Sequence, residues 1–211
     1  MELAQFLIEH GAEVTTQDNF GSTPLHQVSG SHGGSVDLTR LLIEHGADMT
    51  AKDNDGLTPL HKASGSSLYI VNVDLARILI EHGADVTAQD NNGSTPLHQL
   101  SGSIGGNVEL ARFLVEHGAD VAAQDNYGST PLHKLVGSRR AMLDLARFLV
   151  EHGADVTVKD KDGWTPFSLA LFLGSPELQQ VVATALPRVG RLRSIWRRLR
   201  KYGIRILPRQ A

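Results

Sequence analysis

The sequence predicts an all-α solenoid of stacked helix-turn-helix repeats with short β-hairpin fingers. Two phrases recur with the same spacing along its 211 residues. Thr-Pro-Leu-His begins at residues 23, 58, 95 and 130, and a degraded copy, Thr-Pro-Phe-Ser, begins at 165. Glu-His-Gly-Ala places its histidine at 10, 45, 82, 117 and 152. Both phrases advance by 35, 37, 35 and 35 residues, which indicates units that bury their apolar faces only against neighbouring units.

Each unit is expected to contain two helices. A threonine at a helix entrance accepts a hydrogen bond from a free N–H group, and the proline after it presets the backbone where no N–H bond is needed. The second helix is expected after Ser35 and Asn107, where a capping side chain is followed by an acidic residue. Leu38, Leu41 and Leu42 recur at i, i+3 and i+4, which predicts the buried face of this helix.

A glycine is expected to end each second helix, because a left-handed backbone costs least at glycine. These glycines are Gly46, Gly83, Gly118 and Gly153. The chain then turns back into the next unit, as through Asp90-Asn91-Asn92-Gly93. We expect these hairpins to project as fingers.

The combined pattern resembles the ankyrin repeat over roughly residues 1 to 186. Its two parts are Asp-x-x-Gly-x-Thr-Pro-Leu-His and Val-Asp-Leu-Ala-Arg-Phe-Leu-Val-Glu-His-Gly-Ala-Asp-Val. The resemblance implies an ankyrin-like solenoid that binds a protein partner across the concave surface of fingers and first helices. The units are about two to four residues longer than the usual ankyrin repeat. Serine also replaces the usual alanine at Ser29, Ser64 and Ser101, near the join between the two helices.

We divide the chain into three parts. Residues 1–16 are expected to form a truncated repeat with its second helix only, because Met1 occupies the slot of Val36. Residues 17–187 are expected to form four full repeats and a degraded C-terminal one, whose last helix begins at Ser175-Pro176-Glu177. Residues 188–211 form a basic amphipathic tail. The abrupt start is typical of a fragment of a longer array.

The charge is distributed unevenly between the body and the tail. The first 177 residues hold all 23 acidic residues against 11 basic ones, a net charge of −12, whereas the last 34 hold nine basic residues and no acid. Leu192, Ile195, Trp196 and Leu199 recur at i, i+3, i+4 and i+7, which predicts an amphipathic helix. The candidate tail residues are Arg188, Arg191, Arg193, Trp196, Arg197, Arg198, Arg200 and Lys201.

Several roles fit a basic amphipathic tail. It is suited to an anionic membrane, to nucleic acid, to a calmodulin-like groove or to nuclear import. It is equally suited to capping the last repeat, with its arginines on the acidic body. For the capping role, we expect Trp196 to be packed beside the final repeat.

No catalytic, cofactor or metal site is expected, and neither is a small-molecule substrate. Of ten histidines, only His32 lies outside the two repeated phrases, and the His-Glu-x-x-His spacing of zinc sites does not occur. The chain has no cysteine and no grouped nucleophile, base and orienting residue. It also has no basic-then-apolar secretion signal and no apolar run long enough to span a membrane. We therefore expect a non-enzymatic protein in the cytoplasm, with the nucleus as the alternative.

Function is expected where the repeat pattern varies. The fingertips and the exposed side of the first helix differ between repeats, and exposed aromatic residues often dominate protein contacts. The candidate partner-binding residues are Phe20, Gln27, Leu57, Lys62, Asn92, Gln99, Tyr127, Lys134 and Trp164. The sequence thus predicts a non-catalytic protein-binding scaffold or adaptor. Two alternatives are an adaptor that the tail targets to membrane or nucleic acid, and a piece of a longer multidomain ankyrin protein.

Overall fold

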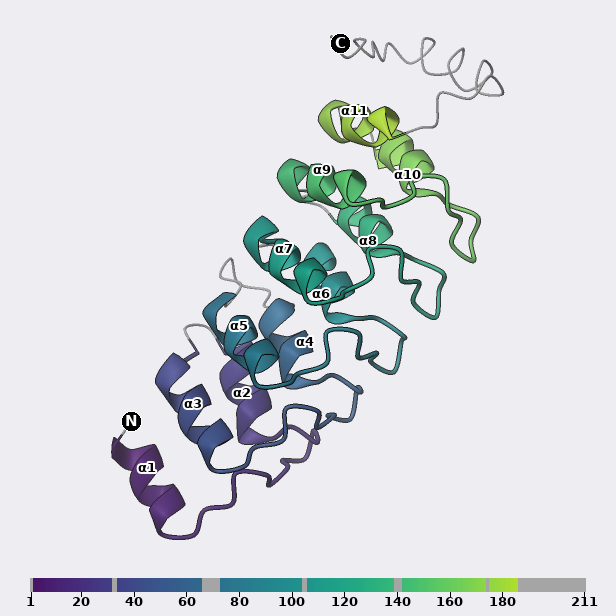
Figure 1. Cartoon of the computed structure of the whole chain (residues 1–211). Coiled ribbons are helices and arrows are strands. Elements are labelled where there is room, and N and C mark those ends of the chain that lie inside the picture. Colours follow the sequence, from purple (N-terminus) through teal and green to yellow (C-terminus); the bar gives the residue numbers. More distant parts are fainter. Residues whose placement is uncertain are drawn as a thin grey trace, which may run out of the picture.

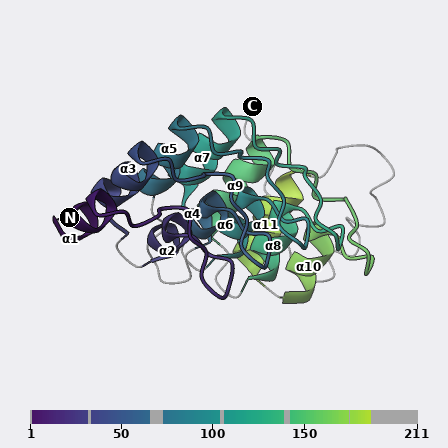
Figure 2. The same cartoon turned by 90° about the horizontal axis from the view of Figure 1, so that it is seen from below.

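The computed structural model of the protein describes residues 2–31, 34–65, 73–103, 106–138, 142–173 and 175–185. These residues contain eleven helices in two parallel rows (Figure 1). The inner row consists of α2 (Pro24–Gly30), α4 (Pro59–Ser64), α6 (Pro96–Gly102), α8 (Pro131–Gly137) and α10 (Pro166–Leu173). The outer row consists of α1 (Glu2–Glu9), α3 (Val36–Glu44), α5 (Val73–Glu81), α7 (Val108–Glu116), α9 (Leu143–Glu151) and α11 (Pro176–Thr184). Seen from below, α3, α5 and α7 lie on one side and α2, α4 and α6 on the other (Figure 2).

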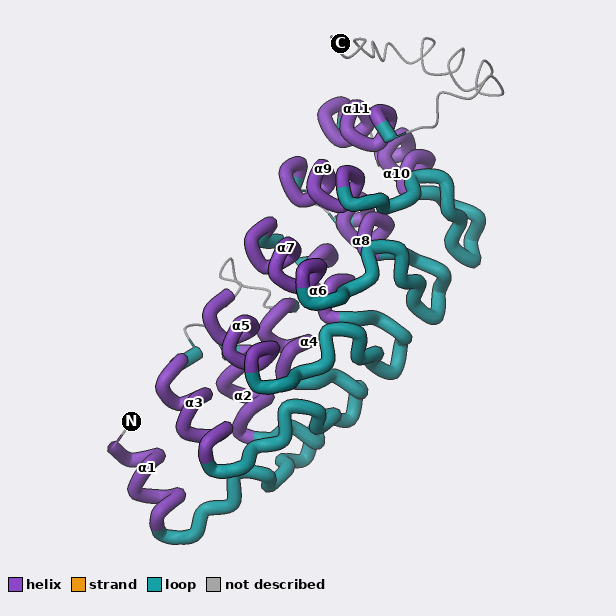
Figure 3. The backbone as a smooth tube through the Cα atoms, viewed as in Figure 1, coloured by secondary structure: helices purple, strands orange, loops and turns teal. Residues whose placement is uncertain are grey.

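Five fingers project from the inner side of the stack, one before each inner helix (Figure 3). We number them one to five, at residues 18–22, 53–57, 90–94, 125–129 and 160–164. The all-α class is confirmed, but the expectation of β-hairpins is wrong, because the described residues contain no strand. Within finger one, the Asp18 N–H donates to the Ser22 carbonyl oxygen at 3.0 Å, and Asn54 of finger two donates one backbone bond to Phe20 at 3.0 Å. A single backbone bond at each junction is too few to form a sheet.

The helix ends are the ones the sequence predicts. Thr23 caps α2 by accepting a bond from the His26 N–H, and a proline follows at the first helical position. Ser35 caps α3 and Asn107 caps α7 in the same way. Gly46, at the end of α3, has a φ of +86°, which is the left-handed conformation expected there.

One apolar core runs between the two rows through the described repeats. Its largest fully buried side chains are all leucines, namely Leu25, Leu60, Leu75, Leu79, Leu97, Leu100, Leu110, Leu114, Leu132, Leu135, Leu145 and Leu149. Burying one such side chain contributes about 1.5–3 kcal/mol. Because inner helices of neighbouring repeats pack against each other, as α6 does against α8, the stability of each repeat depends on its neighbours.

The outer row is joined by cation–π contacts that the sequence did not predict. The Arg77 guanidinium of α5 lies 4.4 Å from the ring centre of Phe113 in α7, and it also pairs with Glu109 at 3.3 Å. Arg112 lies 5.3 Å from the ring centre of Phe148 in the same way. In each contact, a planar guanidinium covers the aromatic ring of the next repeat.

Three serines are buried without a hydrogen bond to any residue that the structure describes. The Oγ atoms of Ser29, Ser64 and Ser101 have no partner, although these residues are at most 1% exposed. The fourth repeat has Val136 in the same slot, so the position accepts an apolar side chain. A buried hydroxyl without a partner loses its bonds to water and gains nothing in return.

We therefore predict that Ser101→Ala stabilises the protein by about 1 kcal/mol, because it removes an unsatisfied hydroxyl and favours the helix. Urea unfolding followed by circular dichroism measures the change. The matched control is Ser103→Ala, because the Ser103 Oγ donates to the Leu100 carbonyl oxygen at 2.8 Å. Removing this hydroxyl should destabilise the protein. A Ser101→Ala protein less stable than wild type would show that the hydroxyl has a bond after all.

Candidate protein-binding surface

A histidine in each of the first four inner helices connects two repeats. The His26 Nε2 lies 2.9 Å from the carbonyl oxygen of Leu57 in the next finger, and Nδ1 lies 3.1 Å from the backbone nitrogen of Thr23. A carbonyl oxygen only accepts and a backbone N–H only donates, so Nε2 carries the proton and Nδ1 is bare. The equivalent pairs are His61 with Ser94, His98 with Ser129 and His133 with Trp164. We call these four residues the bridging histidines.

Burial lowers the pKa of His61, His98 and His133, although the carbonyl oxygen at Nε2 acts in the opposite direction. Protonation would place a second N–H on Nδ1, against the N–H of the threonine. The bridging geometry therefore requires the neutral imidazole.

The histidines of Glu-His-Gly-Ala have the opposite arrangement. Their Nδ1 atoms lie 2.8–2.9 Å from the carbonyl oxygen four residues earlier, so Nδ1 carries the proton. These edge histidines are His10, His45, His82, His117 and His152. They are exposed and follow the outer helices, which separates them from the bridging set.

The fifth repeat has serine in place of the bridging histidine. Ser168 Oγ accepts a bond from the Thr165 N–H at 2.8 Å, and Thr165 Oγ1 accepts one from the Ser168 N–H at 3.0 Å. Serine thus keeps the cap of α10 but lacks the Nε2–H donor that binds a following finger in the first four repeats. The degraded phrase marks the end of the described stack.

In fingers one to four, an aspartate at the base of the finger fixes the finger to its own inner helix. In finger two, Asp53 Oδ1 accepts the N–H groups of Asp55 and Leu57 at 3.0 and 2.9 Å. Its Oδ2 lies 2.7 Å from Lys62 Nζ in α4. Burial raises the pKa of Asp53, but the bonds from Lys62 and Leu57 outweigh burial and keep that pKa below its usual value.

This contact is repeated with alternating chemistry. Gln27, Gln99 and Lys134 reach Asp18, Asp90 and Asp125 at 2.9, 3.1 and 2.7 Å. The residue after the histidine therefore has a structural partner in each of the first four repeats. Sequence reasoning selected Gln27, Lys62, Gln99 and Lys134 for a partner and missed this second role.

A row of asparagines joins the fingertips. Asn91 Nδ2 donates to the Asn54 carbonyl oxygen at 2.9 Å, and Asn54 and Asn126 make the same contact with Asn19 and Asn91 at 3.1 Å. A Cβ at Gly56 would lie 2.5 Å from Asn91 Oδ1, so the glycine leaves the space that the amide fills. Sequence reasoning missed this row, although the asparagines recur with the repeat period.

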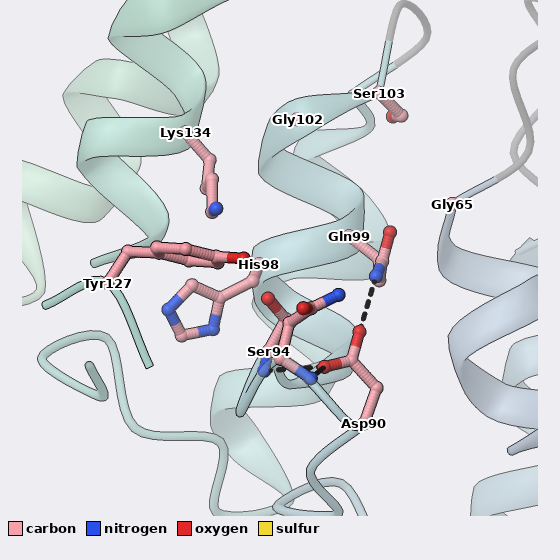
Figure 4. A pocket seen from close by; sticks show the side chains of 10 residues that line it. Gly65, Asp90, Ser94, His98, Gln99, Gly102, Ser103, Tyr127 and Lys134 are labelled. Atoms are coloured by element: carbon pink, nitrogen blue, oxygen red, sulfur yellow. Dashed lines mark hydrogen bonds between the residues drawn. The ribbon is translucent and has the colours of Figure 1, made fainter. Parts of the chain in front are cut away.

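One hollow of about 340 Å³ opens on the concave surface, beside α6 and fingers three and four. Its lining includes four of the candidate residues, namely Asn92, Gln99, Tyr127 and Lys134. Tyr127 and Lys134 lie on one side, and Gln99 with its partner Asp90 lies on the other (Figure 4). The Tyr127 side chain is 58% exposed, and Lys134 Nζ lies 5.7 Å from its ring centre.

The other candidate residues do not share this hollow. Phe20 is 73% exposed at the tip of finger one, while Trp164 lies on finger five with its ring centre 5.2 Å from that of Phe172. Leu57 is half-buried, and its carbonyl oxygen accepts the bond from His26. The three predicted aromatic anchors are therefore separated along the stack. The basic tail and His32 lie outside the described residues.

Within the described parts of the chain, no three histidine, aspartate or glutamate side chains are grouped to hold a metal ion. None of the described helices is both long and apolar enough to cross a lipid bilayer.

A family profile described as ankyrin repeats in three copies matches residues 1–90 and again residues 70–160. The chain belongs to the ankyrin repeat family. No curated protein matches it significantly. Ankyrin repeats are generally modules for protein–protein interaction. The profile stops in finger five, where the ankyrin pattern weakens in sequence as well.

The asparagine row gives a stability prediction. Asn91→Ala removes the amide that connects fingers two and three, so we expect a loss of about 0.5–1.5 kcal/mol in the free energy of unfolding. Asn92→Ala is the matched control, because its exposed side chain takes no part in the row and should change stability by less than about 0.5 kcal/mol. Equal effects in urea unfolding would mean that the row does not hold the fingers together.

Three of the bridging histidines, His61, His98 and His133, give a pH prediction. The unfolded imidazole titrates near pH 6.5, and the folded pKa is lower, so the unfolded state binds more protons below about pH 6.5. Stability is then fully present above that pH and declines as the pH falls toward the folded pKa values. Urea midpoints measured at about pH 7.5 and about pH 5.5 test this direction.

The matched variants are His61→Ala and His82→Ala. His61→Ala leaves the Ser94 carbonyl without its donor, so it should lower stability at neutral pH by about 1–3 kcal/mol and weaken the pH dependence. His82→Ala changes an exposed edge histidine. It should leave the stability at neutral pH and the pH dependence of stability nearly unchanged. A pH response that disappears in His82→Ala but persists in His61→Ala would contradict the assignment.

Proposed function

We propose that this ankyrin protein is a non-catalytic scaffold that binds a protein partner across its concave surface, with Tyr127 at the centre of the contact. The supporting observation is the hollow beside α6, where four variable residues from two repeats come together. Tyrosine offers a large contact area with few rotatable bonds, and it is enriched among the residues that dominate protein interfaces.

The framework around the hollow supports this proposal. Gln99 and Lys134 are held by Asp90 and Asp125, so their positions are set before a partner arrives. The fingers are connected by the asparagine row, which limits their freedom. A surface that is ordered in advance loses less conformational entropy on binding.

The experiment has two steps. A partner is first captured from the native cell lysate and identified, and its affinity for the purified protein is then measured by calorimetry. Tyr127→Ala should weaken binding by about 2 kcal/mol or more, while the helical circular-dichroism spectrum stays unchanged. Adding Phe20→Ala and Trp164→Ala then tests whether the separated aromatic residues contribute.

The control variant is Arg147→Ala, which removes an exposed side chain from α9 in the outer row. It should leave the affinity within about 0.5 kcal/mol of the wild-type value, because residues outside an interface contribute little. A partner that is sensitive to Arg147→Ala and indifferent to Tyr127→Ala would place the binding surface on the outer helices.

A further inference from the structure

The fifth repeat exposes apolar residues where the first four repeats have small or polar ones. Leu169 replaces the glutamine or lysine that follows the bridging histidine, and Leu173 replaces a serine. Phe172 replaces the glycine of the other inner helices. Phe172 is 72% exposed and Leu173 is 51% exposed. With Trp164, these residues form what we call the terminal patch (Trp164, Leu169, Phe172 and Leu173).

The position of Phe172 shows which way the terminal patch faces. A Cβ at the equivalent Gly65 would lie 3.3 Å from the Cβ of Gln99, and one at Gly30 would lie 3.5 Å from the Cβ of Lys62. These glycines thus leave room for the inner helix of the following repeat. The exposed Phe172 ring projects from the equivalent position of α10, on the side that faces a following inner helix at Gly30 and Gly65.

A carboxylate beside the terminal patch also lacks the partner that its counterparts have. Asp160 Oδ1 accepts the N–H groups of Asp162 and Trp164 at 3.1 and 2.8 Å, as in the other fingers. In fingers one to four, Oδ2 binds a glutamine or lysine of the inner helix. Leu169 stands in that place here, and no other described side chain bonds to Oδ2 of Asp160.

We propose that the terminal patch is a docking surface for residues 191–202 of the same chain, with an arginine of that segment paired to Asp160. The apolar residues Leu192, Ile195, Trp196 and Leu199 then cover Phe172 and Leu173. The segment has an apolar stripe that matches the apolar patch, and positive charge without any acid that can pair with Asp160.

The chain lengths make this docking feasible. The last described residue, Ala185, follows α11, which packs against α10. Seven residues from there to Leu192 can span about 23 Å, and the eight residues of α10 extend only about 12 Å. A tethered segment also has an effective concentration on the order of millimolar, which favours it over a separate molecule.

The test uses the fluorescence of Trp196. The chain has two tryptophans, so Trp164→Phe leaves Trp196 as the only one and keeps an aromatic ring in the terminal patch. In the full-length Trp164→Phe protein, we expect a blue-shifted emission and protection from acrylamide quenching, both independent of protein concentration. Adding Phe172→Ser should shift the emission to the red and increase quenching. Adding Leu173→Ser should do the same more weakly.

The matched control is Phe20→Ser in the same background, because Phe20 is equally exposed but lies on finger one; it should leave Trp196 unchanged. Asp160→Asn keeps the acceptor for the Trp164 N–H and should reduce the dependence of docking on salt. Water-exposed emission that is indifferent to Phe172→Ser would overturn the proposal. A blue shift that grows with protein concentration would also overturn it, because it indicates binding to a second copy. A blue shift that requires vesicles containing phosphatidylserine would overturn it as well, because it indicates a tail that binds membrane.

Discussion

The stacking of the described repeats depends on the hydrogen bond from a histidine Nε2–H to a carbonyl oxygen in the next finger. The same ring accepts the N–H of the threonine that begins the inner helix. One neutral imidazole thus caps its own helix and fixes the position of the following repeat. The leucine core supplies most of the burial energy, but apolar contacts are not directional, whereas this bond sets the register in which the leucines meet.

The concave surface derives its order from the same connection. The bridging bond places each of fingers two to five over the preceding inner helix. In fingers one to four, the base aspartate attaches the finger to its own helix, and the asparagine row joins the tips. Because these three connections fix the finger backbone, the side chain before the turn glycine is free to vary. This division explains how Phe20, Asp55, Asn92, Tyr127 and Asp162 can differ without loss of the fold. It also makes the fifth repeat informative, because Ser168, Leu169 and Lys161 replace all three connecting side chains at once.

The sequence was sufficient for the elements whose causes are local. Thr23, Ser35 and Gly46 act on their own turn of backbone, so their spacing predicted helix starts and stops correctly. The apolar stripes likewise predicted which helix faces are buried. The fingers were misjudged as β-hairpins because strands need a ladder of backbone bonds, whereas each finger makes only one backbone bond to the next and few within itself. The Asn91 amide and the Arg77 guanidinium were missed because their partners, Asn54 and Phe113, belong to a neighbouring repeat. Within the site, the sequence located the variable positions but not the hollow, since only the packing of two repeats brings Tyr127 beside Gln99.

Long-range proton–nitrogen correlation NMR spectra of the imidazole rings test the bridging bond most directly, because they distinguish the two neutral tautomers of each histidine. At neutral to slightly alkaline pH, our account predicts the Nε2–H form for His26, His61, His98 and His133, and a proton on Nδ1 for the five edge histidines. The two groups should separate into two sets of signals. Bridging histidines found in the Nδ1–H form, or exchanging between tautomers as free imidazole does, would contradict the account, since neither state can accept the threonine N–H and donate to the next finger.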